Sequence, residues 1–288
     1  MGERDITEKT LADYNDVFAD IVNVLAFEGK LKMDPKDLCS TSVHSQYKAD
    51  DNKLHEEERD VVKYWKKYRT NIALCGLENQ TKIERNMPFR IIGYDGAAYR
   101  SQLLKKRKKI VPVTTFVLYF GTKRRWKKPR SIKELMDIPE ELEPYVNDYK
   151  INVFEIAWLT EKQLKMFRSD FGIVANFFVQ KRKNPNYVPN DTRTIEHVDE
   201  VLKLLSVMTG DERYIELRDR KKGKVTNMCE VIQHVMDMGR TEGTREGENR
   251  LGQLITKLLE AGRNSDVEIV AKDEEARKRF YKEFGITD

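Results

Sequence analysis

The chain has 288 residues, of which 39% are hydrophobic and 35% are charged, and its net charge is +5. This composition excludes an intrinsically disordered chain, and the length suits one large domain or one domain with an extension. The longest nearly apolar run, residues 110–120, is much shorter than the roughly 20 residues that cross a bilayer. We therefore expect a globular protein that has no membrane partner.

Cysteine and histidine usage excludes several classes of site. The three cysteines are far apart, which is typical of reduced thiols and not of a disulfide framework or a CxxC zinc site. The four histidines never form the i, i+4 pair of a helical zinc site, and glycine-rich nucleotide loops and serine-hydrolase elbows are absent. The first residues contain charges but no apolar leader, so we expect a cytoplasmic protein.

The first third of the chain opens with a helix. Apolar residues recur at the helical period within residues 10–27, which predicts an amphipathic helix that ends near Gly29. Residues 31–52 contain Pro35 and many short polar side chains, which predicts a loop with one strand near residues 42–47. Residues 54–68 fit either a helical stripe or a half-buried strand, and periodicity favours the helix.

Strands and helices then alternate. Residues 71–78 form a short apolar run typical of a buried strand, and Pro88 begins a helix that continues to Leu104. Residues 111–120 and 151–159 are rich in β-branched and aromatic residues, which predicts two further strands. This alternation predicts an α/β core.

Beyond residue 160 the pattern is mainly helical. Two prolines and three asparagines within residues 183–192 predict a loop between helices. Glycines recur every four or five residues from Gly239 to Gly252, which indicates a hinge or a surface helix. Residues 251–259 restore an apolar helical face, and a last helix is expected over residues 273–284.

The positive charge is concentrated in one stretch. Residues 100–133 contain 13 Lys and Arg and no acidic residue. Such a stretch favours polyanions, because basic side chains release counterions from nucleic acid, although a solvated charged face is the alternative. Trp126 either stacks on an unpaired base or anchors the loop to the core. The candidate DNA contacts in the two basic clusters are Lys105, Lys106, Arg107, Lys108, Lys109, Lys123, Arg124, Arg125, Trp126, Lys127, Lys128 and Arg130.

The helix that begins at Pro88 adds further candidate DNA contacts. Arg90 and Tyr94 share a helix face through their i, i+4 spacing, and Arg100 lies further along the helix. We expect Arg90, Tyr94 and Arg100 to face phosphate groups. The alternatives are burial of Tyr94 in the core and, for Arg90, a buried stem with a paired guanidinium.

Polar residues at the end of a buried strand indicate a metal site. Glu78 and Gln80 are two positions apart, so their side chains lie on the same face of the sheet. Asp60 lies about twenty residues upstream, as in sites where oxygen ligands hold Mg²⁺ for phosphodiester hydrolysis. This spacing alone is a weak signal.

Six short segments around these residues strengthen this signal. They are DYNDVFADIVNVLAF, LHEEERDV, GLENQT, MPFRIIGYDGAAYRSQL, FVLYFG followed by Trp126, and NDYKINVFEIAWL. In this order they resemble the Rpn group of recombination-promoting nucleases and putative transposases (YhgA-like). The resemblance covers roughly residues 13–159.

The resemblance implies a PD-(D/E)XK nuclease fold. This is an α/β restriction-endonuclease-like core, a mixed sheet flanked by helices, over residues 10–160, and it requires a strand at residues 59–66. A helical extension over residues 161–222 and charged C-terminal helices over residues 223–288 complete the expected organisation.

The resemblance also implies the roles of the site residues. Asp60 and Glu78 match the acidic residues that hold Mg²⁺, or Mn²⁺ as a substitute. Gln80 takes the position usually held by lysine, where its amide can orient water. Asp16 matches an extra carboxylate that the superfamily often supplies to the metal from its first helix.

The leading hypothesis is a metal-dependent DNA endonuclease with Asp60, Glu78 and Gln80 as catalytic residues. The first alternative is a catalytically inactive nucleic-acid-binding or regulatory protein on the same fold. A third possibility is an interaction module whose C-terminal helices assemble homo-oligomers.

Overall fold

A five-stranded mixed sheet forms the centre of the fold, with strand order β1–β4–β5–β6–β7. Its strands are β1 (Leu38–Ser40), β4 (Val61–Lys67), β5 (Thr70–Gln80), β6 (Val113–Tyr119) and β7 (Asn152–Glu155). A separate antiparallel pair joins β2 (His44–Lys48) and β3 (Leu54–Glu58). The computed structural model describes residues 10–41, 44–48, 54–58, 60–68, 70–105, 109–189, 191–221 and 227–286.

The sheet is antiparallel on one side and parallel on the other. β1, β4 and β5 pair in antiparallel fashion, whereas β5, β6 and β7 are parallel. Parallel strands place their carboxyl ends at one edge, and here Gln80, Tyr119 and Glu155 are neighbours in register. With helices on both faces and a helical C-terminal region, the predicted α/β architecture is confirmed.

The helix favoured by periodicity over residues 54–68 is wrong, because β3 and β4 occupy this segment. The strand that the family resemblance requires is present. β4 is buried on both faces: Val62 packs with Leu74, while Lys63 points the opposite way and donates a hydrogen bond to the carbonyl oxygen of Asp13. A strand buried on both faces does not alternate between apolar and polar residues, so its pattern resembles a helical stripe.

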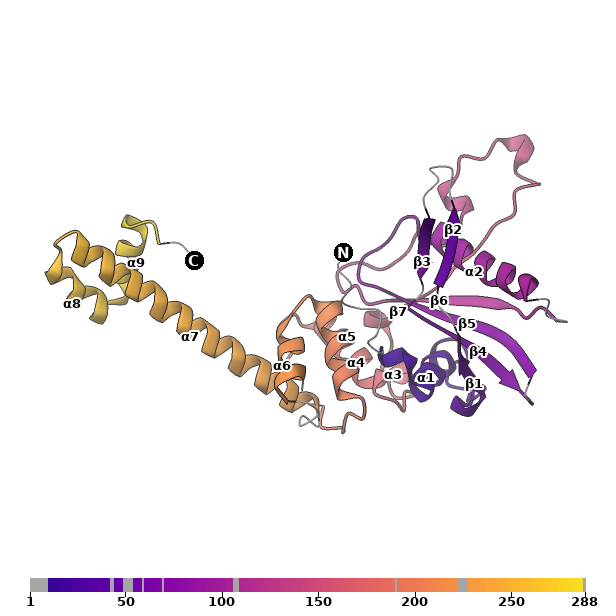
Figure 1. The fold of residues 1–288 in the computed structure, drawn as a ribbon, viewed down its shortest axis with the longest axis horizontal. Helices are drawn as coiled ribbons and strands as arrows, with labels where there is room; N and C mark the ends of the chain where they lie inside the picture. The colour runs from indigo at the N-terminus through magenta and orange to yellow at the C-terminus, as the bar shows by residue number, and fades with distance from the viewer. Residues whose placement is uncertain are drawn as a thin grey trace. The chain divides into compact units, whose positions relative to one another are not determined.

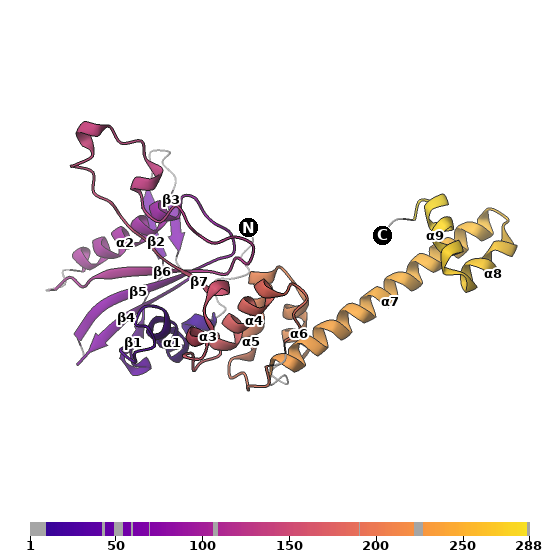
Figure 2. The ribbon, with the colours of Figure 1, turned by 180° about the vertical axis from the view of Figure 1, so that it is seen from behind.

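Helices cover the two faces of the sheet (Figure 1; Figure 2). α2 (Met87–Leu104) packs Met87, Ile91 and Tyr94 against β6 and β7, in a cluster that includes Trp126. α1 (Asn15–Leu25) and α4 (Phe171–Lys183) lie on the opposite face and contact each other. The predicted opening helix, the helix that begins at Pro88 and the strands at residues 71–78, 111–120 and 151–159 are confirmed, the last one ending at Glu155.

The rest of the chain is helical, as predicted. Its helices are α3 (Glu161–Leu164), α5 (Val198–Thr209), α6 (Arg213–Lys221), α7 (Met228–Glu260), α8 (Asn264–Lys272) and α9 (Glu274–Glu283). The chain divides into two compact units, Met1–Val231 and Ile232–Asp288. The second unit has its own apolar cluster around Leu254, Leu258 and Val270.

The glycines from Gly239 to Gly252 lie within α7, so the prediction of a surface helix is confirmed and a hinge is not needed. In the described part of the chain, each helix is too short or too polar to span a membrane.

Candidate functional site

Glu78 lies near the carboxyl end of β5, on the face that α2 covers. Its carboxyl group is almost completely buried, with only 3% of the residue exposed. One oxygen, Oε1, accepts hydrogen bonds from Arg90 Nη2 at 2.7 Å and from Gln80 Nε2 at 3.3 Å. The other oxygen, Oε2, is buried and has no hydrogen-bond partner. An unpaired buried carboxylate oxygen is costly, so this atom is a candidate ligand for a cation.

Asp60 is brought next to Glu78 by the antiparallel pairing of β4 with β5. Val61 lies opposite Leu77, so the residue that precedes β4 lies beside Glu78. The Asp60 carboxylate accepts the backbone N–H of Asn79 at 2.6 Å, and its negative charge acts on the neighbouring Glu78 carboxyl group. The three residues Asp60, Glu78 and Gln80 therefore lie together at the end of one strand pair.

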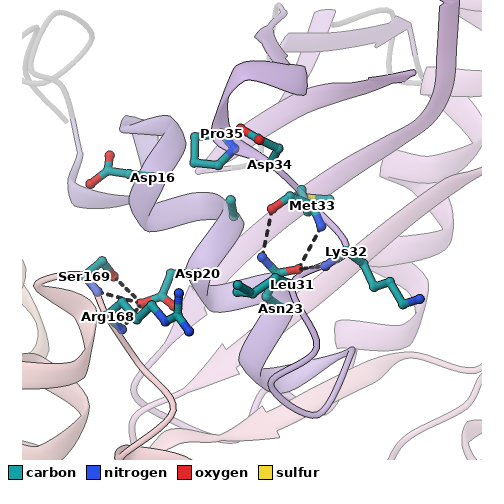
Figure 3. Close-up of a pocket in the computed structure, with 11 residues that line it drawn as sticks. Asp16, Asp20, Asn23, Leu31, Lys32, Met33, Asp34, Pro35, Arg168 and Ser169 are labelled. Atoms are coloured by element: carbon teal, nitrogen blue, oxygen red, sulfur yellow. Dashed lines mark hydrogen bonds between the residues drawn. The ribbon is translucent and has the colours of Figure 1, made fainter. Parts of the chain in front are cut away.

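The predicted role of Asp16 requires a correction. In the described part of the chain, the Asp16 carboxylate lies within 4.8 Å of ligand atoms of Glu196 and His197. Among the described residues, it does not form such a group with Asp60 and Glu78. Asp16 also lines a cavity of about 360 Å³ between α1, residues 31–35 and residues 168–169 (Figure 3). Because packing of α1 turns this side chain toward the segment before α5, we leave Asp16 out of the proposed ligands beside Glu78.

The two halves of the basic stretch lie at opposite ends of β6. Lys105 and Lys109 are exposed near its amino end, whereas residues 121–130 follow its carboxyl end. Seven residues of strand separate these ends by about 20 Å. The predicted single patch is therefore split, and only the second half lies at the edge that carries Gln80, whose carbonyl oxygen accepts the N–H of Phe120.

The loop of residues 121–130 is organised around the buried Trp126 and the partly buried Glu155. Trp126 is completely buried, packs edge-on against Tyr119 at 5.3 Å between ring centroids, and donates its indole N–H to the carbonyl oxygen of Pro129. No ring face remains for a base, so the expectation of stacking is corrected and the alternative, a loop anchor, is supported. Glu155 accepts hydrogen bonds from Arg125 and from the backbone of Trp126.

A family comparison assigns the chain. A family model described as putative transposase, YhgA-like, matches residues 51–213, which is more than half of the 288 residues. The chain belongs to this family. The match confirms the resemblance expected from the sequence and includes Asp60, Glu78 and the basic stretch. Neither a curated protein nor a solved structure matches the chain.

The other predicted DNA contacts of this YhgA-like family member differ in exposure. Tyr94 is 2% exposed and its hydroxyl accepts a hydrogen bond from Arg90, so it belongs to the core and is also withdrawn from the set of DNA contacts. Arg100 is exposed, but α2 carries it toward the end that is remote from Glu78. Arg130 donates to the backbone carbonyls of Trp126 and Val153. Residues Lys106, Arg107 and Lys108 lie outside the described residues.

Sequence reasoning missed Glu155. Burial acts to raise the pKa of Glu155, but hydrogen bonds from Arg125 and the Trp126 backbone outweigh burial and lower this pKa. The charged carboxylate therefore fixes the basic loop beside the strand ends. Its position at the end of a β-rich run, as for Glu78, was the available signal, but its partners are thirty residues earlier in the chain and the sequence does not indicate them.

The pKa of Glu78 is raised from 4.5 to about 7. Burial is the largest cause and the negative charge of Asp60 adds to it, whereas Arg90 and Gln80 act in the opposite direction. The ion pair with Arg90 is therefore too weak to offset desolvation. Without a metal ion, burial therefore favours the protonated form of Glu78.

This shift predicts a pH-dependent stability. A carboxyl group whose pKa is raised on folding binds its proton more tightly in the folded state, so its contribution to stability falls as pH rises from about 4.5 to 7. Glu78→Gln removes the titration. In EDTA, we expect the free energy of unfolding of Glu78→Gln to rise relative to wild type by about 3 kcal/mol between pH 4.5 and pH 8. Urea unfolding at several pH values measures this difference.

The exposed Glu141→Gln variant is the matched control, and its unfolding free energy should follow wild type at every pH. If the difference in unfolding free energy between Glu78→Gln and wild type is constant from pH 4.5 to pH 8, then Glu78 titrates with an ordinary pKa.

Proposed function

We propose that this protein is a metal-dependent endonuclease that hydrolyses phosphodiester bonds in DNA. The observation that carries the proposal is the buried Glu78 carboxylate, with one unpaired oxygen, beside Asp60 and Gln80 at the end of a strand pair. Membership of a family of putative transposases supports DNA as the substrate.

The residues present fit a hard divalent cation. Glu78 and Asp60 supply carboxylate oxygens, which Mg²⁺ and Mn²⁺ prefer. The unpaired Oε2 of Glu78 gains a partner if it binds such an ion, which removes the cost of its burial. Bound Mg²⁺ would neutralise charge on the phosphoryl group and lower the pKa of a coordinated water.

In the wider superfamily a lysine orients the attacking water and supplies positive charge. Here Gln80 takes the first role and Arg90 takes the second. The amide of Gln80 is neutral, so it can orient a water molecule by hydrogen bonds but supplies no charge. Arg90 brings a guanidinium within 2.7 Å of Glu78, and its side chain is 38% exposed. Its planar group can therefore hydrogen-bond a phosphate oxygen beside the site and stabilise developing negative charge.

The experiment that tests the proposal is plasmid nicking by the full chain with Mg²⁺, Mn²⁺ or EDTA. Cleavage in both metals and none in EDTA is expected. A protein that leaves the plasmid intact in all three conditions would contradict the proposal.

Two features favour a second candidate function, namely DNA binding without cleavage. Arg90 already occupies one oxygen of Glu78, and Gln80 stands where the superfamily usually has lysine, so both features weaken a metal-activated site. A non-catalytic protein of this kind would bind DNA in a salt-dependent way, with equal affinity in Mg²⁺ and EDTA, and would leave the plasmid intact.

Either function predicts DNA binding through the exposed basic residues of the loop after β6. Lys123, Arg124 and Lys127 extend into solvent at the same edge as Gln80. Replacing all three with Ala should lower affinity for duplex DNA about 10- to 100-fold at 0.1 M salt. The slope of log K against log salt should also fall by up to about 3, because each phosphate contact contributes about 0.9. Fluorescence anisotropy over a salt series measures both quantities.

The second compact unit offers a charge-matched control, the exposed set Lys272, Arg279 and Lys282. Replacing this set with Ala removes the same charge, so equal losses of affinity in the two triple variants would rule out the loop as the binding surface.

A further inference from the structure

Packing of α1 beside the segment before α5 gathers three side chains with metal-ligand chemistry. Asp16, Glu196 and His197 each place one ligand atom within 4.8 Å of the other two. Asp16 is 180 residues from Glu196, so tertiary structure alone forms this cluster. The proposed nuclease function uses none of these residues.

The imidazole of His197 has an unused nitrogen. Nε2 is buried and has no hydrogen-bond partner, and Asp16 Oδ2 lies 3.6 Å away. This separation is too long for a direct hydrogen bond. Two ligands bound at about 2.1 Å to one tetrahedral ion lie about 3.4 Å apart, which is close to the observed separation.

Neighbouring groups hold the imidazole in place. The buried carboxylate of Asp170 accepts the backbone N–H groups of Glu196 and His197, with the shortest contact at 2.7 Å. The ring of His197 stacks on Tyr14 with centroids 3.6 Å apart and planes at 23°. Tyr14 in turn donates its hydroxyl to Glu200 at 2.7 Å. Such outer contacts orient the histidine ligands of metal sites.

The charge and access of this position also suit a cation. Asp199 and Glu200 lie in the first turn of α5, so they add negative charge at the helix end that follows His197. The Asp16 side chain is 49% exposed, so an ion can reach its carboxylate from solvent. In Figure 3 this carboxylate points away from the hydrogen-bonded Asn23 and Met33.

We propose that Asp16, Glu196 and His197 bind a divalent transition-metal ion, with Zn²⁺ as the preferred member of this class. An imidazole with two carboxylates favours Zn²⁺ over Mg²⁺, and three protein ligands leave a coordination position open. The ion joins α1 to the start of α5 and therefore stabilises the packing of the helical extension on the sheet domain. This proposal is independent of the proposed nuclease function.

The test is Zn²⁺ binding by the full chain in a Glu78→Ala background, which removes the buried carboxylate of the other candidate metal site. Calorimetric titration of EDTA-stripped protein should show one equivalent of Zn²⁺ bound at this cluster, and Zn²⁺ should raise Tm. His197→Gln and Glu196→Gln should each weaken Zn²⁺ binding at least about 10-fold. Glu196 is exposed, so its replacement leaves the fold intact.

His234→Gln on α7 and Asp34→Asn in the cavity of Figure 3 are matched controls, and both should bind Zn²⁺ like the reference protein. With Co²⁺ as a second probe, the visible absorption band of the bound ion should change in His197→Gln and persist in the controls. Absence of Zn²⁺ binding by the reference protein overturns the proposal. Equal Zn²⁺ affinity in the reference, His197→Gln and Glu196→Gln proteins also overturns it. Plasmid cleavage is not part of this readout, so failure of either proposal is distinguishable from failure of the other.

Discussion

Glu78→Gln is expected to reduce metal-dependent plasmid cleavage by roughly 10³-fold or more while DNA affinity stays within about twofold of wild type. The amide keeps the size of the side chain but carries no negative charge, so it is a poor ligand for Mg²⁺. DNA binding should persist because the exposed basic residues of the loop after β6 are unchanged. Nicking rates in Mg²⁺ and anisotropy with duplex DNA measure the two effects.

The controls separate loss of the site from loss of the fold. Glu141→Gln changes an exposed carboxylate and should cut DNA at the wild-type rate. Because burial raises the pKa of Glu78, Glu78→Gln should also be at least as stable as wild type at pH 8, so unfolding does not explain its loss of cleavage. Cleavage by Glu78→Gln at the wild-type rate would show that the active site lies elsewhere in the chain.

Trp126→Ala should lower the free energy of unfolding by about 3 to 5 kcal/mol. The substitution leaves a cavity among Tyr119, Ile91 and Val153, and it leaves the carbonyl oxygen of Pro129 without its indole donor. Guanidinium unfolding monitored by circular dichroism measures the loss.

Lys127→Ala is the matched control because it removes an exposed side chain from the same loop, and its unfolding free energy should stay within about 0.5 kcal/mol of wild type. An unfolding free energy that is unchanged in Trp126→Ala would contradict the buried position of Trp126. If Trp126 stacked on DNA bases, Trp126→Ala would weaken binding to single strands by about 1 to 3 kcal/mol and leave stability unchanged.

Local sequence patterns determined the identity of most elements. The apolar runs of β5, β6 and β7 are long enough to exclude exposed loops, and the helical period of α1 is regular, so each element was predictable from its own residues. The two-residue spacing of Glu78 and Gln80 also determined that they share a face, because side chains alternate along any strand. The sequence of β4 was ambiguous because a strand buried on both faces lacks the alternation of apolar and polar residues from which strands are predicted.

The tertiary structure decided which distant residues meet. The register of β4 with β5 brings Asp60 to Glu78, and the parallel pairing of β6 with β5 places the second basic cluster, and not the first, at the edge that carries Gln80. Packing of α1 places Asp16 beside His197. The contacts of Trp126 with Tyr119 and Pro129 place this side chain in the core, although its neighbours in the sequence are cations. Each of these outcomes depends on strand pairing or packing between segments far apart in sequence, and local periodicity carries no information about either.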